Sequence, residues 1–264
     1  MQAALLRVVL ERTVGDLELP PDVAVVAAAN PPEQAADGWD LSAPLANRLC
    51  HLLWEATPQS IAEGLAGGWP TPSVPLLPDQ WEAGESATKA LIAAFLRVRP
   101  ALAIAPPVTA ADAGKAWPSP RTWEMAARLM TAASAAEATG EAHSALIRGA
   151  VGDGAGTEFL AWLTEMDLPD PEEVLADPAK FQLPERGDRA YAALASIAAA
   201  VAARPTPDRW TAAWRVLGMC AQSAPDVAAS AAMTLARCRP EGMIEMPPEI
   251  RLFGQLVRDA GLTT

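Results

Sequence analysis

Three polar side chains in the first 121 residues are of types that bind phosphate groups or organise water beside them. Asn30 directly follows an apolar run at 23–29, at the carboxyl end of an expected buried strand, where ligands of α/β sheets collect. Arg48 and Arg121 carry guanidinium groups, which stay charged and fork onto phosphate oxygens. Arg121 also falls in the first turn of an expected helix, and helix N-termini attract anions. These residue types favour an anionic ligand.

Each of these residues also has a purely structural interpretation. Asn30 and Pro31 form a dipeptide that is typical of turns. Arg48 could form a surface salt bridge with one of three acids that precede it in the chain, Glu33, Asp37 and Asp40. A structural role is less favourable for Arg121, because a cation in the first helical turn faces the positive end of the helix dipole.

Apolar patterning predicts the elements that would position these side chains. Residues 3–12 have leucine and valine at helical spacing, and a glycine and a proline pair then interrupt the pattern, which predicts a helix followed by a hairpin-like turn. The continuous apolar runs at 23–29 and 50–54 predict two strands that are buried on both faces. A short helix is expected between them, at 41–48.

From residue 59 onward the sequence predicts helices separated by proline and glycine. Ser119-Pro120, Thr206-Pro207 and Ala224-Pro225 place proline at the first turn of three of these helices. The proline-rich segment 67–82 is too irregular for a helix or a strand. The expected helices cover residues 59–66, 83–98, 120–138, 141–150, 154–166, 186–203, 207–221, 225–238 and 247–259.

Composition excludes several classes of function. The 264 residues are enough for one large or two modest domains, and the net charge of −12 argues against nucleic-acid binding and against acidic lipid surfaces. Apolar stretches of about ten residues are too short to cross a bilayer, which needs roughly 20, so no membrane span is expected. The three cysteines are odd in number and lack CxxC spacing, which argues against a disulfide framework and a zinc ribbon and favours a cytoplasmic location.

Three segments occur in a recognisable order. AALLRVVLERTVGDLELPPDVAVV at 3–26 overlaps VVAAANPPEQAADGWDLSAPLANRL at 25–49, and WPSPRTWEMAARL follows at 117–129. Their order and spacing resemble the later motifs of an AAA+ ATPase of the MoxR type. The first segment resembles the helix and hairpin that follow the Walker B strand in that family. The resemblance covers the chain up to about residue 135.

The resemblance implies a role for each candidate residue. Asn30 corresponds to sensor 1, whose amide orients the attacking water beside the γ-phosphate of ATP. Arg48 corresponds to the arginine finger, which stabilises charge on the γ-phosphate bound by a neighbouring subunit. Arg121 corresponds to sensor 2, which moves with a helical lid onto the nucleotide. The resemblance implies that ATP and Mg²⁺ are the ligands. It also implies assembly with neighbouring AAA+ subunits in a homo-oligomeric ring, and action on a client protein that is not identified.

Two parts of such an ATP site are missing from the sequence. The phosphate-binding motif GxxxxGK[ST] does not occur, because Gly114-Lys115 is followed by Ala and Trp and no glycine lies five residues before Gly114. The run at 23–29 contains no Walker B acid that could hold Mg²⁺. We therefore expect that the nucleotide-binding half precedes this sequence, has been lost, or comes from another chain. Alone, the chain is expected neither to hydrolyse ATP nor to bind ATP or Mg²⁺ tightly.

Other residues capable of chemistry fit structural roles better. His51 and His143 lie in separate segments, which gives no support to a zinc site or a Ser-His-Asp triad. The stretch VGDGAGTE at 151–158 predicts a break between helices rather than a phosphate or calcium loop. The acidic run at 165–177 is interpreted as a solvated surface or, alternatively, as a docking face.

The tryptophans divide into two groups by their surroundings in the sequence. Three fall at amphipathic helical positions and are predicted to lie in the core, namely Trp162, Trp210 and Trp214. Three others fall in loops, where contact with a partner is a more credible role, namely Trp39, Trp69 and Trp81.

The sequence as a whole predicts a mostly α fold, in which the C-terminal remnant of an AAA+ α/β P-loop domain precedes an all-α lid and a helical extension. The expected boundaries are 1–56 for the α/β part, 57–138 for the lid with sensor 2, and 139–264 for the extension. The expected function is that of the carboxyl-terminal portion of a MoxR-like ATPase, which couples ATP hydrolysis to remodelling or maturation of a partner protein. The alternative is a non-catalytic helical module, in which residues 140–264 bind a protein.

Overall fold

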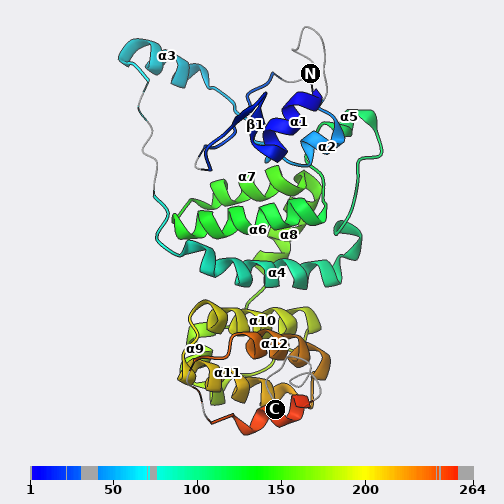
Figure 1. Ribbon diagram of the computed structural model, residues 1–264, viewed down its shortest axis with the longest axis vertical. Coiled ribbons are helices and arrows are strands. Elements are labelled where there is room, and N and C mark those ends of the chain that lie inside the picture. The colour runs from blue at the N-terminus through cyan, green and yellow to red at the C-terminus, as the bar shows by residue number, and fades with distance from the viewer. Residues whose placement is uncertain are drawn as a thin grey trace. The chain divides into compact units, whose positions relative to one another are not determined.

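The protein is mostly helical in the part of the chain that the computed structural model describes, residues 2–21, 23–30, 41–69, 71, 76–241, 243 and 245–254 (Figure 1). This confirms the predicted mostly α character. Within those residues the strands are β1 (Thr13–Val14) and β2 (Leu17–Glu18), which pair antiparallel. Gly15 in the turn between them has a φ of 62°, a conformation that glycine adopts without strain.

The chain divides into two compact units that are each built from segments distant in sequence. Unit 1 comprises 1–76, 101–126 and 139–157, and unit 2 comprises 77–100, 127–138 and 158–264. Two helices, α6 (Pro120–Ala135) and α8 (Asp153–Glu165), contribute residues to both units. The other elements of unit 1 are α1 (Gln2–Glu11), the hairpin, α2 (Ala43–Ala46), α3 (Pro58–Gly67), α5 (Ala110–Ala113) and α7 (Gly140–Val151).

The last four α-helices of the chain belong to unit 2, and Figure 1 shows them close together in yellow and orange. Three helices of the protein, α6, α11 and α12, begin at the prolines that were expected to start them, because a proline at the first helical position removes no internal hydrogen bond. The elements of unit 2 are η2 (Trp81–Gly84), α4 (Glu85–Val98), α9 (Pro171–Ala176), η4 (Pro178–Lys180), α10 (Gly187–Ala203), α11 (Pro207–Cys220), α12 (Pro225–Arg237) and η5 (Pro248–Phe253). A short turn, η3 (Pro100–Leu102), follows α4.

Aromatic side chains form the centre of the unit 2 core. Trp210 and Trp214 of α11 have no exposed surface, and their rings meet edge to face with centroids 5.7 Å apart. The Trp210 Nε1–H donates to the Leu235 carbonyl of α12 at 2.8 Å, so its one polar group is satisfied inside the core. Phe253 of η5 packs on Trp214 at 5.8 Å. Trp162 is also buried, so the prediction that these three tryptophans lie in the core is confirmed.

Burial of Cys220 in this core links the stability of the protein to alkaline pH. Desolvation raises the pKa of its thiol to about 11. A raised pKa in the folded state means that stability is fully present below the unfolded pKa of about 9 and is lost as pH rises toward 11. We expect the unfolding free energy to fall between pH 8 and pH 11 by about 2 kcal/mol more in the wild type than in Cys220→Ala. Urea unfolding across that pH range measures the difference, and parallel curves would contradict the expectation.

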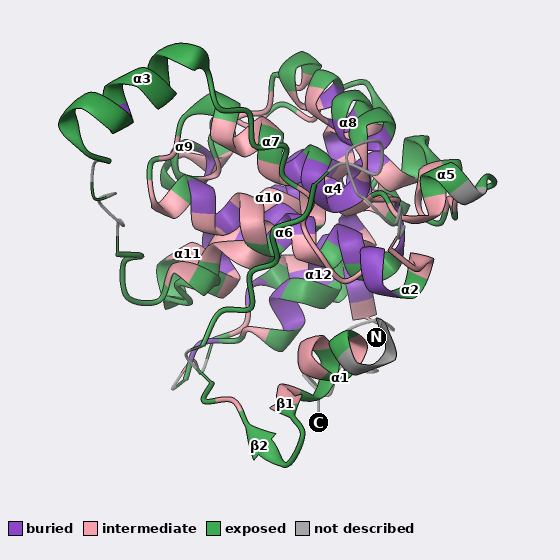
Figure 2. Ribbon diagram, turned by 90° about the horizontal axis from the view of Figure 1, so that it is seen from above, coloured by how far each residue is buried: buried purple, intermediate pink, exposed green. Residues whose placement is uncertain are grey.

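The two predicted buried strands are not formed, and this expectation was wrong. Residues 23–30 and 50–54 have no regular secondary structure, and Val26, Leu53 and Trp54 are 88%, 81% and 92% exposed. A strand buried on both faces needs neighbouring strands to accept and donate its backbone hydrogen bonds. Among the described residues the hairpin is the only paired sheet, so these apolar segments have no strand to join. Figure 2 shows exposed residues along α3 as well, which carries one buried residue, Gly64.

The acidic run at 165–177 is partly structural. Asp170 caps α9 by accepting from the Glu172 N–H at 2.8 Å, and Val174 and Leu175 are buried. The Glu172 carboxylate is bound by two nitrogens of the Arg209 guanidinium, which lowers the pKa of Glu172.

No helix in the described part of the chain is long and apolar enough to span a membrane.

Candidate functional site

The structure joins the two motif segments that carry Arg48 and Arg121, and Asn47 makes the connection. Asn47 is 2% exposed, and its Nδ2 donates to the Trp117 carbonyl at 3.1 Å. Its Oδ1 accepts from Ser119 Oγ at 2.9 Å and from Arg121 Nη1 at 3.2 Å. We call Asn47, Ser119, Arg121 and Thr122 the Asn47 cluster. The cluster places the residue before Arg48 in direct contact with Arg121.

A capping box fixes the start of the helix that carries Arg121. The Thr122 N–H donates to Ser119 Oγ at 3.2 Å, and the Ser119 N–H donates in return to Thr122 Oγ1 at 2.8 Å. Ser119 and Thr122 are both buried, so their polar atoms are satisfied within unit 1. Arg121 lies between them in the chain and is exposed. The cap therefore fixes the backbone of Arg121, whose side chain is exposed overall although its Nη1 donates to Asn47.

Arg48 is half-buried and follows α2, and its side chain folds back on that helix. Its Nη1 donates to the Pro44 carbonyl in α2, and its Nε has no hydrogen-bond partner among the described residues. The three acids that offered a salt bridge to Arg48 lie outside the described residues. An unsatisfied buried N–H is a group that a ligand oxygen would stabilise.

Asn30, the third candidate, is exposed and lies in the irregular segment 23–30. No hydrogen bond among the described residues joins Asn30 to the Asn47 cluster, and Pro31, with which it was expected to form a turn, lies outside them. Its expected position rested on a strand that the structure does not form.

Gly149 in α7 and Gly152 at its C-cap form a glycine corner, which packs against the two segments that carry the Asn47 cluster. Gly149 packs so tightly on residues 50–51 that a Cβ there would lie 2.4 Å from the His51 carbonyl oxygen, and its own carbonyl accepts from the His51 N–H at 2.8 Å. Gly152, with a φ of 89°, would place a Cβ 2.7 Å from the Ala116 carbonyl oxygen. The predicted break at 151–158 is confirmed at Gly152, where α7 ends. The two glycines allow the backbone of α7 to approach residues 50–51 and Ala116 closely.

Substitution of Gly149 tests this packing. Alanine is intrinsically better than glycine inside a helix by about 1 kcal/mol. We nevertheless expect Gly149→Ala to destabilise the protein by about 1–3 kcal/mol, because the added methyl overlaps the His51 carbonyl. Gly154→Ala in α8, where a Cβ meets no atom within 4 Å, is the matched control and is expected to be neutral or stabilising. Urea unfolding of both variants measures the difference, and equal effects would refute the close approach.

The chemistry of the Asn47 cluster suits an anion. Its functional groups are a guanidinium, an amide and two hydroxyls, and it contains no carboxylate. Within the described residues no group of three or more His, Cys, Asp and Glu side chains could hold a metal ion. His51 uses its Nε2 on the Ala46 carbonyl at 2.9 Å, in keeping with a structural role.

Asn47 itself was missed by sequence reasoning. It occupies the C-cap of α2, where a polar residue often serves only to end a helix. Its partners lie 70–74 residues further along the chain, and no local pattern marks them. Its position directly before a candidate arginine is the one signal that could have drawn attention to it.

Comparisons of this chain with protein-family models, with curated proteins and with solved structures found no match.

Of the three tryptophans that were predicted to lie in loops, two are described and have different surroundings in the structure. Trp81 lies under the Arg128 guanidinium, 5.3 Å from its ring centroid, and the exposed ring of Trp69 rests on Gly64. Trp39 lies outside the described residues.

Proposed function

We propose that this chain is the carboxyl-terminal portion of a MoxR-like AAA+ ATPase, which hydrolyses ATP in a ring to remodel or mature a client protein. The observation that carries the proposal is the hydrogen bond between Arg121 Nη1 and Asn47 Oδ1. It brings together two of the sequence segments on which the family resemblance rests, although they are separated by about seventy residues. A chance likeness of two short segments gives no reason for them to meet in space.

The exposed position of Arg121 supports a role in binding phosphate. Arg121 stands in the first turn of α6, where the backbone N–H groups and the helix dipole favour an anion. With its backbone held by the capping box, its guanidinium can reach a phosphate oxygen at little further loss of entropy. In this proposal Arg121 contacts the nucleotide, Arg48 stabilises charge on the γ-phosphate bound by a neighbouring subunit, and Asn30 positions the attacking water.

The exposed apolar segments of unit 1 support the existence of a covering partner. Val26, Leu53 and Trp54 come from the two runs whose sequence favours buried strands, yet they face solvent. Exposed apolar surface of this kind favours contact with a partner. We propose that these runs pair with the central strands of a nucleotide-binding half, and that Asn30 reaches its working position only in that sheet.

The groups that would hold ATP and Mg²⁺ are absent from this chain. The sequence has no GxxxxGK[ST] motif, and the Asn47 cluster offers no carboxylate for a divalent cation. The residues present therefore do not fit a magnesium site. In the proposed enzyme the other half binds both, and this chain supplies the residues that respond to the γ-phosphate.

The test is to purify the native protein from its own cells through a tag at the C-terminus of this sequence. The intact mass and the copurifying polypeptides are then measured together with ATP hydrolysis. The proposal expects a GxxxxGK[ST] peptide, either in a product heavier than 27.6 kDa or in a bound subunit, and ATPase activity that Arg121→Ala lowers. A product of 27.6 kDa with no such subunit and no ATPase activity would refute it.

A helical protein-interaction module remains the second candidate, and the core of unit 2 favours it. The buried cluster from Val174 to Phe253 is extensive enough to support a fold that does not depend on a nucleotide. This candidate predicts that the tagged protein retains its partner without ATP and after Arg121→Ala. The ATPase proposal predicts that partner binding changes with both.

A further inference from the structure

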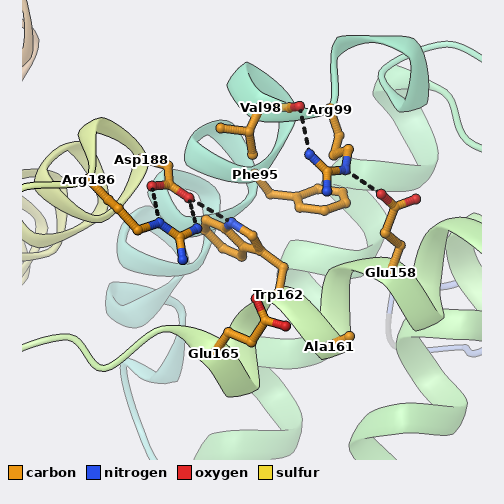
Figure 3. Close-up of a pocket in the computed structure, with 9 residues that line it drawn as sticks. All are labelled: Phe95, Val98, Arg99, Glu158, Ala161, Trp162, Glu165, Arg186 and Asp188. Atoms are coloured by element: carbon orange, nitrogen blue, oxygen red, sulfur yellow. Dashed lines mark hydrogen bonds and ion pairs between the residues drawn. The ribbon is translucent and has the colours of Figure 1, made fainter.

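Unit 2 contains a pocket of about 380 Å³ that the proposed ATPase role does not use (Figure 3). The carboxyl-terminal end of α4, one face of α8 and the start of α10 form its walls. Along α8 the lining residues are 158, 161, 162 and 165, the spacing of a single helix face. The volume lies within the range of about 300–1,000 Å³ that is usual for small-ligand sites.

Two buried aromatic side chains lie beneath the pocket, of which Phe95 has no exposed surface and Trp162 is 6% exposed. Phe95 of α4 and Trp162 of α8 meet edge to face, with ring centroids 5.6 Å apart. Trp162 Nε1–H donates to Asp188 Oδ2 at 3.2 Å, so a hydrogen bond fixes the orientation of the indole. Ala161 is small and exposed beside these rings, which leaves space over them.

The charges around the pocket leave an excess of one negative charge. Arg99 pairs with Glu158, and Arg186 pairs with Asp188 at 2.7 Å, so each guanidinium has a carboxylate partner. Glu165 also lines the pocket, and its carboxylate makes no ion pair within 4 Å in the described part of the chain. Figure 3 shows Glu165 on the α8 side of the pocket, below Trp162.

Helix ends add to this negative potential. α4 ends at Val98 and α8 ends at Glu165, and the carboxyl end of a helix carries partial negative charge. Arg99 and Arg189 each donate to one of these terminal carbonyls and offset part of it. The two arginines that line the pocket, Arg99 and Arg186, both have carboxylate partners, whereas the Glu165 carboxylate makes no direct ion pair in the described part of the chain and interacts with Arg186 only at longer range.

We propose that this pocket binds an organic cation with an apolar stem, a protonated primary amine on an alkyl chain. The stem lies over Ala161 and against Trp162, and the ammonium group is held by Glu165. Such a group is carried by a lysine side chain of a protein and by a free diamine, and the two share the same recognition chemistry. The inference is independent of the ATPase proposal, because no residue of the Asn47 cluster takes part.

The test is isothermal titration of the full chain with 1,5-diaminopentane and with Nα-acetyl-lysine methylamide, and with 1-pentanol as the neutral control. We expect saturable binding of at least one amine and no saturation by the alcohol. Binding by the diamine alone identifies a free amine as the ligand, and binding by the lysine derivative identifies a protein side chain. Failure of both amines to bind, or equal binding of the alcohol, would overturn the proposal.

Two variants separate the charge of the pocket from its space. Glu165→Gln is expected to weaken amine binding about fivefold, the usual effect of one partly exposed charge. Ala161→Met fills the space over the rings and is expected to weaken binding at least about tenfold, with the charges unchanged. Glu173→Gln in α9 changes a carboxylate that does not line the pocket and should leave binding unchanged. If Glu165→Gln bound the amine as tightly as the wild type, the assigned role of Glu165 would be wrong.

Discussion

In the proposed ATPase assembly, replacing Arg48 with alanine is expected to lower ATP hydrolysis by a factor of about 10³ or more, with little change in folding. The expected size follows from arginine residues that neutralise charge on a transferring phosphoryl group, which contribute about 10³–10⁵ in rate. Arg48 makes its described hydrogen bond to Pro44 of the preceding short helix, so its loss removes little structure. The measurement is the turnover number of the native complex at saturating ATP.

Matched substitutions distinguish this catalytic role from a general loss of charge. Arg48→Lys keeps the charge but loses the planar fork, so it should recover only a small part of the rate. Arg215→Ala removes an exposed arginine of α11 in unit 2 and should leave the rate unchanged. If Arg48→Ala retained more than about a tenth of the wild-type rate, Arg48 would not be the arginine finger.

Trp210→Ala is expected to destabilise unit 2 by about 3–5 kcal/mol, the usual effect of truncating a fully buried aromatic residue. Trp210 has no exposed surface, packs against Trp214 and donates its indole N–H to the Leu235 carbonyl. The substitution therefore removes a large apolar contact, leaves a cavity and breaks a buried hydrogen bond. A loss of this size is a large share of the 5–15 kcal/mol that stabilises a typical domain.

Urea unfolding followed by far-ultraviolet circular dichroism measures the effect without relying on tryptophan fluorescence. Trp54→Ala is the control, because Trp54 is 92% exposed and its removal should change stability by less than about 0.5 kcal/mol. Trp210→Phe keeps an aromatic ring and should fall between the two. Similar unfolding curves for Trp210→Ala and Trp54→Ala would contradict the described core.

The helices could be predicted from the sequence because the signals that start and stop them are local. Pro120, Pro207 and Pro225 each begin a helix in the structure as expected, since a proline at the first helical position acts within one turn. The sequence did not predict α9, which lies in the acidic run at 165–177. Its two buried residues are too few to give a clear periodic pattern.

The expected strands and the connection through Asn47 depend on residues far away in sequence, and this is where sequence reasoning failed. The runs at 23–29 and 50–54 have the composition of buried strands, but a strand forms only when another strand completes its hydrogen bonds. Asn47 contacts Trp117, Ser119 and Arg121 because the glycine corner at Gly149 and Gly152 holds both segments against α7. Composition carries no information about such a meeting of distant segments.

The interleaved composition of the two units has a consequence for how the protein is made. The chain passes from one unit to the other after residues 76, 100, 126, 138 and 157. A ribosome releases these segments in order, so unit 1 cannot complete its contacts until residue 157 has emerged. By then residues 77–100 and 127–138 of unit 2 have already been synthesised without their partners in 158–264. Nascent chains halted before that point would present the apolar faces of α4 and α6 to the cell, and we expect them to be bound by chaperones and rapidly degraded.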